Sequence, residues 1–533
     1  MADIICRYRR PGTRPPLQRF LLVWLLAGSV GLLYLATLAP AVVWQDSAMF
    51  QVRIWQVDLR GELALSMSHP LYIVVGWAFA KVTPGDFAWR VSFFSAVCSA
   101  GAIGFLFAGL RRLTRSTWSA LAATGLLAVS HTFWTHAVIA EVYGLYTLLL
   151  AVEMYLLIRY HRDVRHNPWW LIALCLVSGL NVSNHLLALL HLPAYGIYAL
   201  LQVRARRIRA THLILMLLAL VVGAGLYEAM IVAELAGGAD LTDTVRSAFS
   251  DMRCPDRVLG RMPDLATLAK CVGYFLLNFP TPLLLLAPIG IYHALKDPRT
   301  RPVAAIWFAT CALTFFFALR YRVPDQFVFF APCYLFTAVF IGLAADRIIQ
   351  ARPLLVSLPG RIAVLVLVLL PVVVYELAPG AIRRVPFLTR IADTALRAKR
   401  AIPGRDIYTY FLRPRKNGDH SAGDFARAAL KLAQPDGLII AGQTTRNPII
   451  YIQTIQGLYP GVYLASGDDL KAGREVTVDL STVDRWLESG RRVFIVSPRR
   501  QAGLASWLEA QGRFSIISRR TLYEVQFTAK PAN

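Results

Sequence analysis

Acidic side chains stand at two places where an apolar segment of the chain ends. Asp46 comes two residues after Trp44, at the end of the first apolar segment, and Glu141 lies between two apolar segments, close to His136 and Tyr143. An ionisable group at a membrane boundary is costly to keep there, so it is by default a functional candidate. A carboxylate in such a place can take a proton from a reacting hydroxyl. Each acid also has a structural interpretation, because Asp46 could cap a helix and Glu141 could form an ion pair between spans.

Basic and histidine side chains lie at similar boundaries. A buried Glu141 would need a partner, and Arg90 or the Arg320-Tyr321-Arg322 cluster could provide one. His69 precedes Pro70, and this turn could either bind a ligand or be structural. These residue types could therefore handle a proton and an anion at one face of a membrane.

The composition is that of a membrane protein. Of the 533 residues 56% are hydrophobic and the mean hydropathy is +0.49, which is more apolar surface than one soluble core could bury. The net charge is +24, and many of the 56 Lys and Arg residues lie in short clusters at the ends of apolar segments. Such clusters set membrane topology, and no nucleic-acid-binding motif accompanies them. The cysteines show no metal-ligand spacing, so we expect neither zinc nor a disulfide framework.

Basic clusters fall in every second connection between the apolar segments, as the positive-inside rule demands. This pattern predicts a cytoplasmic N-terminus over residues 1–19 and a transmembrane domain over residues 20–380. The loops 45–87 and 237–270 would then lie on the outer side. Eleven spans are expected, at 20–44, 88–110, 117–137, 141–158, 168–182, 184–202, 211–235, 271–295, 303–319, 325–345 and 362–379.

The first outer loop is expected to hold two helices. Asp46-Ser47 could begin a helix that runs to about Glu62. Residues 71–82 are apolar but number only about twelve, well short of the roughly 20 that cross a bilayer. We therefore expect an interfacial helix there.

Residues 381–533 have the composition of an ordinary soluble protein. Leu438 to Ala441, Val462 to Ala465 and Arg492 to Ser497 predict strands that are each followed by a helix, and Phe514 to Phe527 predicts a closing hairpin. The sequence therefore predicts a polytopic α-helical membrane protein with a C-terminal extracytoplasmic α/β domain.

Several short motifs resemble one family. They are Asp46 in the first outer loop, Ser68-His69-Pro70-Leu71-Tyr72, Phe87-Ala88-Trp89-Arg90, Phe133-Trp134, Ala140-Glu141-Val142-Tyr143-Gly144-Leu145, Asn184-His185 ahead of Pro193-Ala194, and Tyr321-Arg322-Val323-Pro324-Asp325-Gln326, with weaker similarity at Tyr410 to Pro414 and Ala441 to Pro460. In combination they resemble the transmembrane protein 260 family, a branch of the GT-C glycosyltransferases related to protein O-mannosyltransferases. Relatives often carry an acidic turn in the soluble domain where this chain has residues 442–447, which puts any role of that turn in doubt.

The resemblance implies a GT-C-like inverting transferase that uses a polyprenyl- or dolichyl-phosphate sugar at the outer membrane face. Asp46 would be the general base for an acceptor hydroxyl on a protein Ser/Thr or a glycan. Glu141 and His69 would lie beside the sugar or acceptor. The remaining residues that we assign by this resemblance are Arg90, Arg320 and Arg322 for the lipid phosphate, and Tyr143, His185 and Asp325 for substrate. A divalent ion between Asp46 and Glu141 stays open, because some enzymes of this class use one and others do not.

Two other functional classes stay open. A lipid-linked-sugar transporter or flippase would also place charges inside a helical bundle, although the matched repeats typical of transporters are not seen here. A non-catalytic membrane scaffold could bind a partner through residues 381–533, but it leaves the acids at the membrane unexplained. We expect a bacterial inner membrane with the C-terminal domain in the periplasm, or the endoplasmic reticulum membrane if the chain is eukaryotic.

Overall fold

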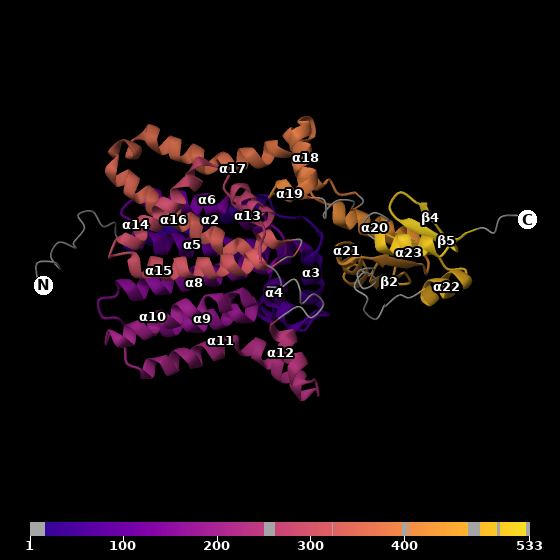
Figure 1. Cartoon of the computed structure of the whole chain (residues 1–533), viewed down its shortest axis with the longest axis horizontal. Helices are drawn as coiled ribbons and strands as arrows, with labels where there is room; N and C mark the ends of the chain where they lie inside the picture. The colour runs from indigo at the N-terminus through magenta and orange to yellow at the C-terminus, as the bar shows by residue number, and fades with distance from the viewer. Residues whose placement is uncertain are drawn as a thin grey trace, which may run out of the picture.

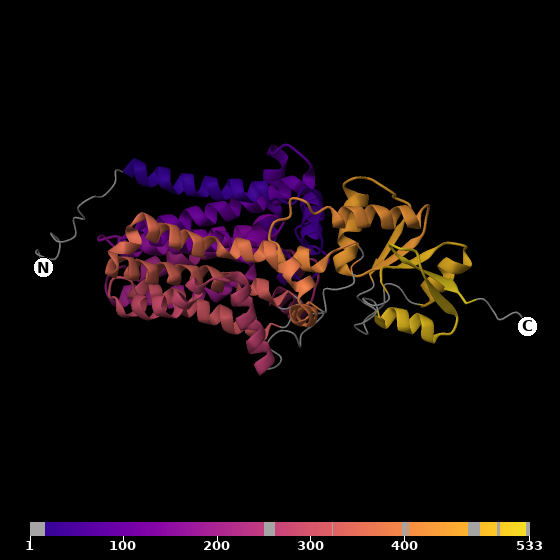
Figure 2. The ribbon, with the colours of Figure 1, turned by 90° about the horizontal axis from the view of Figure 1, so that it is seen from above.

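The computed structural model describes residues 16–249, 262–321, 323, 325–396, 402, 404–466, 480–497 and 502–528. It consists of a helical bundle and an α/β domain attached to one end of that bundle (Figure 1). A view from above places the α/β domain beyond the ends of the long helices, at the end away from the start of α2 (Pro16–Ala36) (Figure 2).

Within the described residues, seven helices are long and apolar enough to cross a membrane. They are α5 (Phe87–Leu113), α8 (Val142–Arg162), Leu186–Arg204, α11 (Thr211–Ala236), α15 (Arg301–Arg320), Gln326–Ala351 and α17 (Leu358–Arg384). Shorter apolar helices accompany them at Phe20–Ala36, Thr117–Ala128, Trp169–Asn184, Leu265–Asn278 and Pro282–Lys296. The predicted multi-pass helical membrane domain is confirmed, whereas the number of eleven spans stays a prediction.

Two of the expected single spans are broken. Residues 117–137 form α6 (Thr117–Ala128) and α7 (His131–Ala137), and residues 271–295 are divided between α13 (Leu265–Asn278) and α14 (Leu286–Lys296). The free N–H groups that open α7 find side-chain partners: His131 N donates to Tyr375 Oη at 3.0 Å and Thr132 N to Asn278 Oδ1 at 2.9 Å. Distant helices thus supply the hydrogen bonds that a helix start needs.

Close backbone contact holds the bundle together where glycines face each other. A Cβ on Gly179 of α9 (Trp169–Asn184) would lie 2.1 Å from Leu220 O, and one on Gly223 of α11 would lie 2.3 Å from Leu176 O. Only glycine permits this approach, which is a common way for helices to pack in a membrane.

The first outer loop contains α3 (Asp46–Gln56), η1 (Leu65–Met67) and α4 (Pro70–Val82). The helix expected at 71–82 is confirmed as α4. The expectation that the first helix reaches Glu62 is wrong, because Val57 takes a left-handed conformation and ends it at Gln56. The remaining bundle elements are α2 (Pro16–Ala36), η2 (Leu186–Leu190), α10 (Leu192–Arg204), α12 (Leu241–Phe249), η4 (Pro282–Leu285), η5 (Gln326–Phe330), α16 (Ala331–Ala351), η6 (Pro353–Val356) and α18 (Pro386–Ala395).

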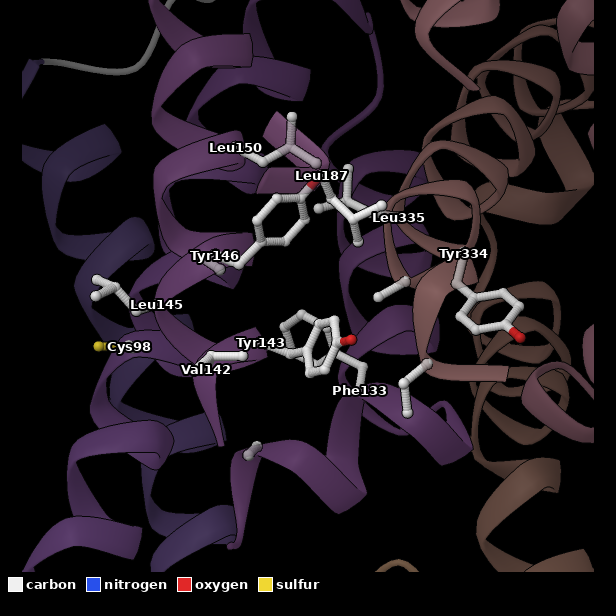
Figure 3. Packing of buried hydrophobic residues seen from close by; sticks show 14 of the residues in the cluster. Cys98, Phe133, Val142, Tyr143, Leu145, Tyr146, Leu150, Leu187, Tyr334 and Leu335 are labelled. Carbon is white, nitrogen blue, oxygen red and sulfur yellow. The ribbon is translucent and has the colours of Figure 1, made fainter. Parts of the chain in front are cut away.

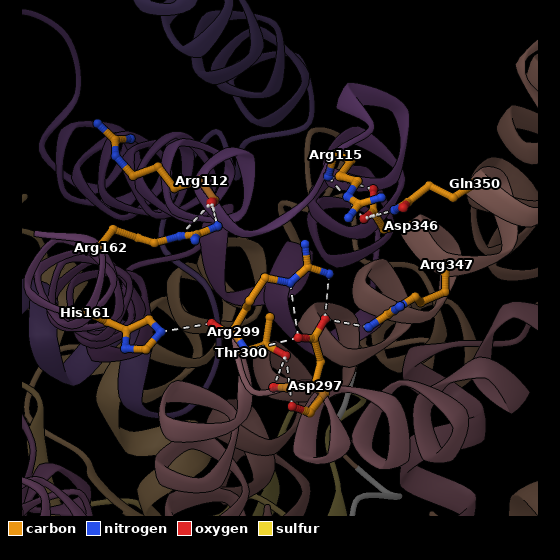
Figure 4. A network of polar contacts seen from close by, with 11 residues as sticks. Arg112, Arg115, His161, Arg162, Asp297, Arg299, Thr300, Asp346, Arg347 and Gln350 are labelled. Atoms are coloured by element: carbon orange, nitrogen blue, oxygen red, sulfur yellow. Dashed lines mark hydrogen bonds and ion pairs between the residues drawn. The ribbon is translucent and has the colours of Figure 1, made fainter. Parts of the chain in front are cut away.

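Polar side chains tie helix ends together at the end of the bundle away from the α/β domain (Figure 4). Asp297 pairs with Arg299 at 3.0 Å and with Arg347 at 2.5 Å. Arg162 donates to Arg112 O at 2.7 Å, which joins α8 to α5. The basic clusters that the sequence places on one side of the membrane thus include a network at one end of the fold.

The C-terminal domain is built on a five-stranded sheet in the order β2-β1-β3-β5-β4. Its strands β1 (Leu438–Ala441), β2 (Tyr463–Ser466), β3 (Val493–Ile495), β4 (Phe514–Ser518) and β5 (Tyr523–Phe527) confirm the predicted strands and hairpin. Strand β1 is parallel to both neighbours, and β5 joins β3 and β4 antiparallel. The domain helices are α19 (Ile407–Leu412), α20 (Ser421–Ala433), α21 (Gln443–Thr454), α22 (Leu480–Glu488) and α23 (Ala502–Ala510).

The two faces of this sheet belong to different hydrophobic cores. Leu438 and Ile440 pack in a small core within the domain, whereas Ile439 and Ala441 belong to the large core that continues into the helical bundle. Neighbouring strand residues point to opposite faces, so one face of the sheet is the domain's own and the other is shared. Helices α20 and α21 lie on the shared side. The domain is therefore docked on the bundle by apolar packing.

Candidate active site

Asp46 opens α3 and is half-buried at the end of the bundle that carries the α/β domain. The next side chain connects it to a distant segment, because Ser47 Oγ accepts a hydrogen bond from Ala140 N at 3.0 Å. Asp46 and Glu141 are the direct neighbours of this bonded pair. The structure therefore brings together the two acids that the sequence singled out.

Glu141 is the residue before α8, and its backbone is fixed from α5. Its N–H donates to Ser95 Oγ at 3.2 Å, and Ser95 Oγ donates to Glu141 O at 3.3 Å. Burial raises the pKa of Glu141 well above its usual range, and the nearby carboxylates of Asp46 and Asp325 raise it further. Glu141 therefore keeps its proton more readily than an ordinary glutamic acid does.

Asp325 is the third acid of this group and lies just before η5. The following residue is an anchor: Gln326 Nε2 donates to Ala318 O at 2.8 Å, and Lys270 Nζ donates to Gln326 Oε1 at 3.2 Å. Asp325 is within electrostatic range of both Glu141 and Tyr143. Asp46, Glu141 and Asp325 thus reach one place from three separate parts of the chain, and we call them the outer acid cluster.

Two histidines beside this cluster have opposite hydrogen-bonding roles. His69 Nδ1 lies 2.8 Å from Asn184 O, and because a carbonyl only accepts, Nδ1 donates and Nε2 of the neutral ring is an acceptor. His185 Nδ1 accepts from Leu187 N at 3.1 Å, so its neutral ring carries the proton on Nε2. The ring centroids are 4.9 Å apart. Burial lowers the pKa of His69 to about 4, so this ring is uncharged at neutral pH.

Arg53 holds the turn before His69 and was not assigned a role from the sequence. It is 5% exposed and donates to Ser68 O at 2.6 Å and Leu59 O at 2.8 Å. A buried guanidinium with several carbonyl partners fixes the loop rigidly. An arginine in the middle of a short helix next to a membrane was the signal available in the sequence.

Aromatic rings form a wall next to the acids. The ring of Tyr143 stacks on His136 at 5.1 Å and lies 5.3 Å from His185. Figure 3 shows Tyr143 beside Phe133, at the edge of the packed core. A cavity of about 10 Å³ lies among side chains that include Thr132, His136 and Tyr143. This volume is about that needed for one water molecule.

Two of the predicted phosphate-binding arginines, Arg90 and Arg320, lie in described helices. Arg90 Nη1 donates to Ala80 O at 2.7 Å, where it caps the end of α4, and its guanidinium lies over Phe87. Arg320 ends α15 with its guanidinium 5.7 Å from the Phe316 ring. Arg322 lies outside the described residues. Their roles toward a donor stay predictions.

A segment after the last long helix adds residues that the sequence analysis did not assign. Lys416 is buried and donates to Tyr410 O at 2.8 Å, and the guanidinium of Arg405 lies 5.0 Å from the Tyr410 ring. Tyr410 is within electrostatic range of Glu141, so this segment lies near the outer acid cluster. Burial lowers the pKa of Lys416 to about 8. The signal in the sequence was the weak family resemblance at Tyr410 to Pro414.

The acids Asp46 and Glu141 are the residues expected to hold a divalent ion, if one is bound. Within the described part of the chain, no three His, Cys, Asp or Glu side chains are arranged to hold a metal ion. A divalent ion held between Asp46 and Glu141 stays a prediction.

Comparisons with known proteins agree with this architecture. Residues 64–209 match the family model described as the Protein O-mannosyl-transferase TMEM260 N-terminal domain. This range includes His69, Arg90, Glu141, Tyr143 and His185. No curated protein matches the chain.

The fold is similar to that of ArnT from Cupriavidus metallidurans. For ArnT bound to undecaprenyl phosphate the TM-score is 0.60 at 13% identity, over 97% of this chain and 100% of that one. For apo ArnT the TM-score is 0.54 at 14% identity, over 95% and 97%. The chain therefore has an ArnT-like fold, and its residues 64–209 are similar to the N-terminal domain of the TMEM260 protein O-mannosyl-transferases.

Proposed function

We propose that this protein is an inverting membrane glycosyltransferase that moves a sugar from a polyprenyl- or dolichyl-phosphate donor to a hydroxyl acceptor outside the cytoplasm. The observation that carries the proposal is the outer acid cluster, in which three acids from separate segments lie beside two neutral histidines. The structural relative bound to undecaprenyl phosphate supports a lipid-phosphate donor. The family description supports mannose as the sugar and a protein as the acceptor.

The reaction is a single displacement at the anomeric carbon. The acceptor oxygen forms a bond to this carbon from one side while the bond to the phosphate oxygen breaks on the other. The electron pair of the breaking bond leaves with the lipid phosphate, and the acceptor proton passes to the Asp46 carboxylate. A base positioned in this way contributes about 10²- to 10⁴-fold to the rate.

The neighbouring acids have different roles because one keeps its proton while the other is ionised. Carboxyl groups that share a site ionise one after another, and the one in the more costly environment keeps its proton. Because the pKa of Glu141 is raised, Glu141 donates a hydrogen bond to a sugar hydroxyl while Asp46 accepts the proton. His69 Nε2 and His185 Nε2–H offer one acceptor and one donor to a further hydroxyl, and Tyr143 packs against the sugar.

The leaving phosphate gains negative charge and needs cations. We assign this role to Arg320 and Arg322, which lie just before Asp325 in the sequence. Arg90, after the first outer loop, is the third candidate. Figure 1 shows the α/β domain beyond the bundle end that carries the site. In the proposed orientation this domain and the site face the periplasm or the endoplasmic reticulum lumen.

The test is sugar transfer by purified protein in detergent. Radiolabelled polyprenyl-phosphate mannose and glucose are offered with Ser/Thr peptides and glycans as acceptors. We expect Asp46→Asn to lower transfer by about 10²- to 10⁴-fold. Asp424→Asn is the matched control, because Asp424 lies on the surface of α20 with an exposed side chain. Undiminished transfer by Asp46→Asn refutes the assigned base, and movement of labelled lipid across liposomes without an acceptor would favour a flippase instead.

A further inference from the structure

The connection from α2 to α3 is held by the C-terminal domain at several points. Lys416 N donates to Thr37 O at 2.9 Å, where this connection begins. Trp44 is 1% exposed, its Nε1 donates to Ser421 Oγ at 2.8 Å, and its ring lies 5.3 Å from Phe425 of α20. The stretch that leads to Asp46 thus has its partners in a part of the chain nearly four hundred residues away.

A further contact concerns Gln45, the residue directly before Asp46. Gln45 has φ 64° and ψ −137°, a backbone conformation that residues other than glycine rarely adopt. Such a conformation persists only where the surroundings impose it. Asn447 Nδ2 donates to Gln45 O at 3.1 Å, and Gln45 N lies 3.5 Å from Thr444 O.

Asn447 is well placed to impose that conformation. It lies in the second turn of α21, it is 5% exposed, and α21 packs against α3. The helix directly follows strand β1, which is paired on both sides, so the start of the helix is fixed by the interior of the sheet. The turn at 442–447, whose role the sequence left in doubt, is the part of the domain that touches Gln45.

We propose that Asn447 is a positioning residue for catalysis, and that the α/β domain completes the active site by holding the Gln45–Asp46 backbone. This inference rests on the proposed role of Asp46. The amide of Asn447 binds Gln45 O, Gln45 keeps its unusual conformation, and the Asp46 carboxylate is aimed at the acceptor hydroxyl. The C-terminal domain then acts on the reaction without touching sugar or lipid.

The test compares two substitutions in the same helix. Asn447→Leu removes the donor to Gln45 and keeps the number and branching of the side-chain heavy atoms. Gln453→Leu is the matched control, because Gln453 Nε2 donates to Val462 O at 2.8 Å and Tyr459 O at 3.0 Å, both inside the domain. Both variants are made in the full-length protein and are measured for kcat, for KM of the lipid donor, and for backbone hydrogen exchange.

We expect Asn447→Leu to lower kcat by on the order of 10- to 100-fold, as a small displacement of a reacting group does, while KM for the donor is unchanged. Exchange in peptides that contain Gln45 and Asp46 should rise in this variant. The control Gln453→Leu should change neither quantity. Wild-type kcat and exchange in Asn447→Leu, or an equal loss in both variants, would overturn the proposal.

Hydrogen exchange separates this inference from the proposed function. If the wild-type protein transfers no sugar, the proposed reaction fails and the role of Asn447 in that reaction fails with it. Increased exchange at Gln45 in Asn447→Leu would then still establish the mechanical contact, and unchanged exchange would remove that as well.

Discussion

Helix α8 carries two acids in opposite situations. Glu141 precedes the helix, is half-buried, and has other acids as its electrostatic neighbours. Glu153, three turns further, is completely buried and accepts hydrogen bonds from His191 Nδ1 at 3.0 Å, Tyr195 Oη at 3.0 Å and Asn181 Nδ2 at 3.2 Å. The neighbours of Glu141 disfavour its charged form, whereas the neighbours of Glu153 donate hydrogen bonds to its carboxylate.

This difference distinguishes an acid that is available for catalysis from an acid that holds helices together. A buried acid with a full set of donors stabilises a fold, since losing one partner leaves the others unsatisfied. An acid held near like charges costs stability and is retained for function. The Glu153 group joins α8, α9 and α10, and His191 Nε2 extends it to Tyr146 Oη at 2.7 Å. Figure 3 shows Tyr146 in the packed interior of the same helix that carries Tyr143.

Among the variants that compare these two acids, the largest effect on sugar transfer is expected at Glu141. Glu141→Leu should lower sugar transfer by about 10²-fold, because the side chain no longer donates a hydrogen bond to the sugar. Its thermal unfolding temperature at pH 7 should equal or exceed that of the wild type, because the substitution removes an acid from beside Asp46 and Asp325. The two measurements are kcat and thermal unfolding in detergent. If the variant loses both activity and much of its stability, Glu141 has a structural role like that of Glu153.

The opposite pattern is expected at Glu153. Glu153→Leu leaves three buried donors without their acceptor and should destabilise the protein by about 3 kcal/mol. Glu153→Gln keeps the shape and an acceptor oxygen, so its loss should be smaller. Transfer per folded molecule should stay near the wild-type value in both. Denaturant unfolding followed by tryptophan fluorescence measures the first quantity, and inactive but stable variants would show that Glu153 belongs to the chemistry.

A smaller effect is expected from the pH dependence of His69. Its pKa is lowered by burial to about 4, below the ordinary value of 6.5, so between these values the unfolded chain binds more protons than the folded one. Stability should therefore fall as the pH drops from about 6.5 toward 4. His69→Gln removes this contribution, so its unfolding temperature should fall less over the same range. The exposed His420→Gln is the control, and identical curves for wild type and His69→Gln would contradict the assignment.

Much of the fold could be predicted from the sequence, because a bilayer imposes long apolar helices and the α/β domain has regular strand patterns. The break between α6 and α7 could not. Ser130 is not a strong helix breaker, and the hydrogen bonds that open α7 come from Tyr375 and Asn278, which are far away in the sequence. Tertiary contacts therefore determine where α7 begins.

The candidate site was predictable where a charged residue interrupts apolar sequence, as at Asp46 and Glu141. The same signal was present at Glu153 and was passed over, because the segment around it was treated as uniformly apolar. The contact of Asn447 with Gln45 could not be predicted, because an asparagine in a polar turn has no distinctive pattern and its partner is 402 residues away.

Because the chain is synthesised from its N-terminus, Gln45 is made well before its partner Asn447. The ribosome completes the helical bundle before it reaches Asn447, and until then Gln45 has no amide to hold it. The nascent membrane domain can therefore already have its helices and its acids and still lack a correctly aimed base. If Asp46 and Asn447 have the proposed roles, sugar transfer begins only when the C-terminal domain has folded against the first outer loop, so the protein is inactive while it is being synthesised.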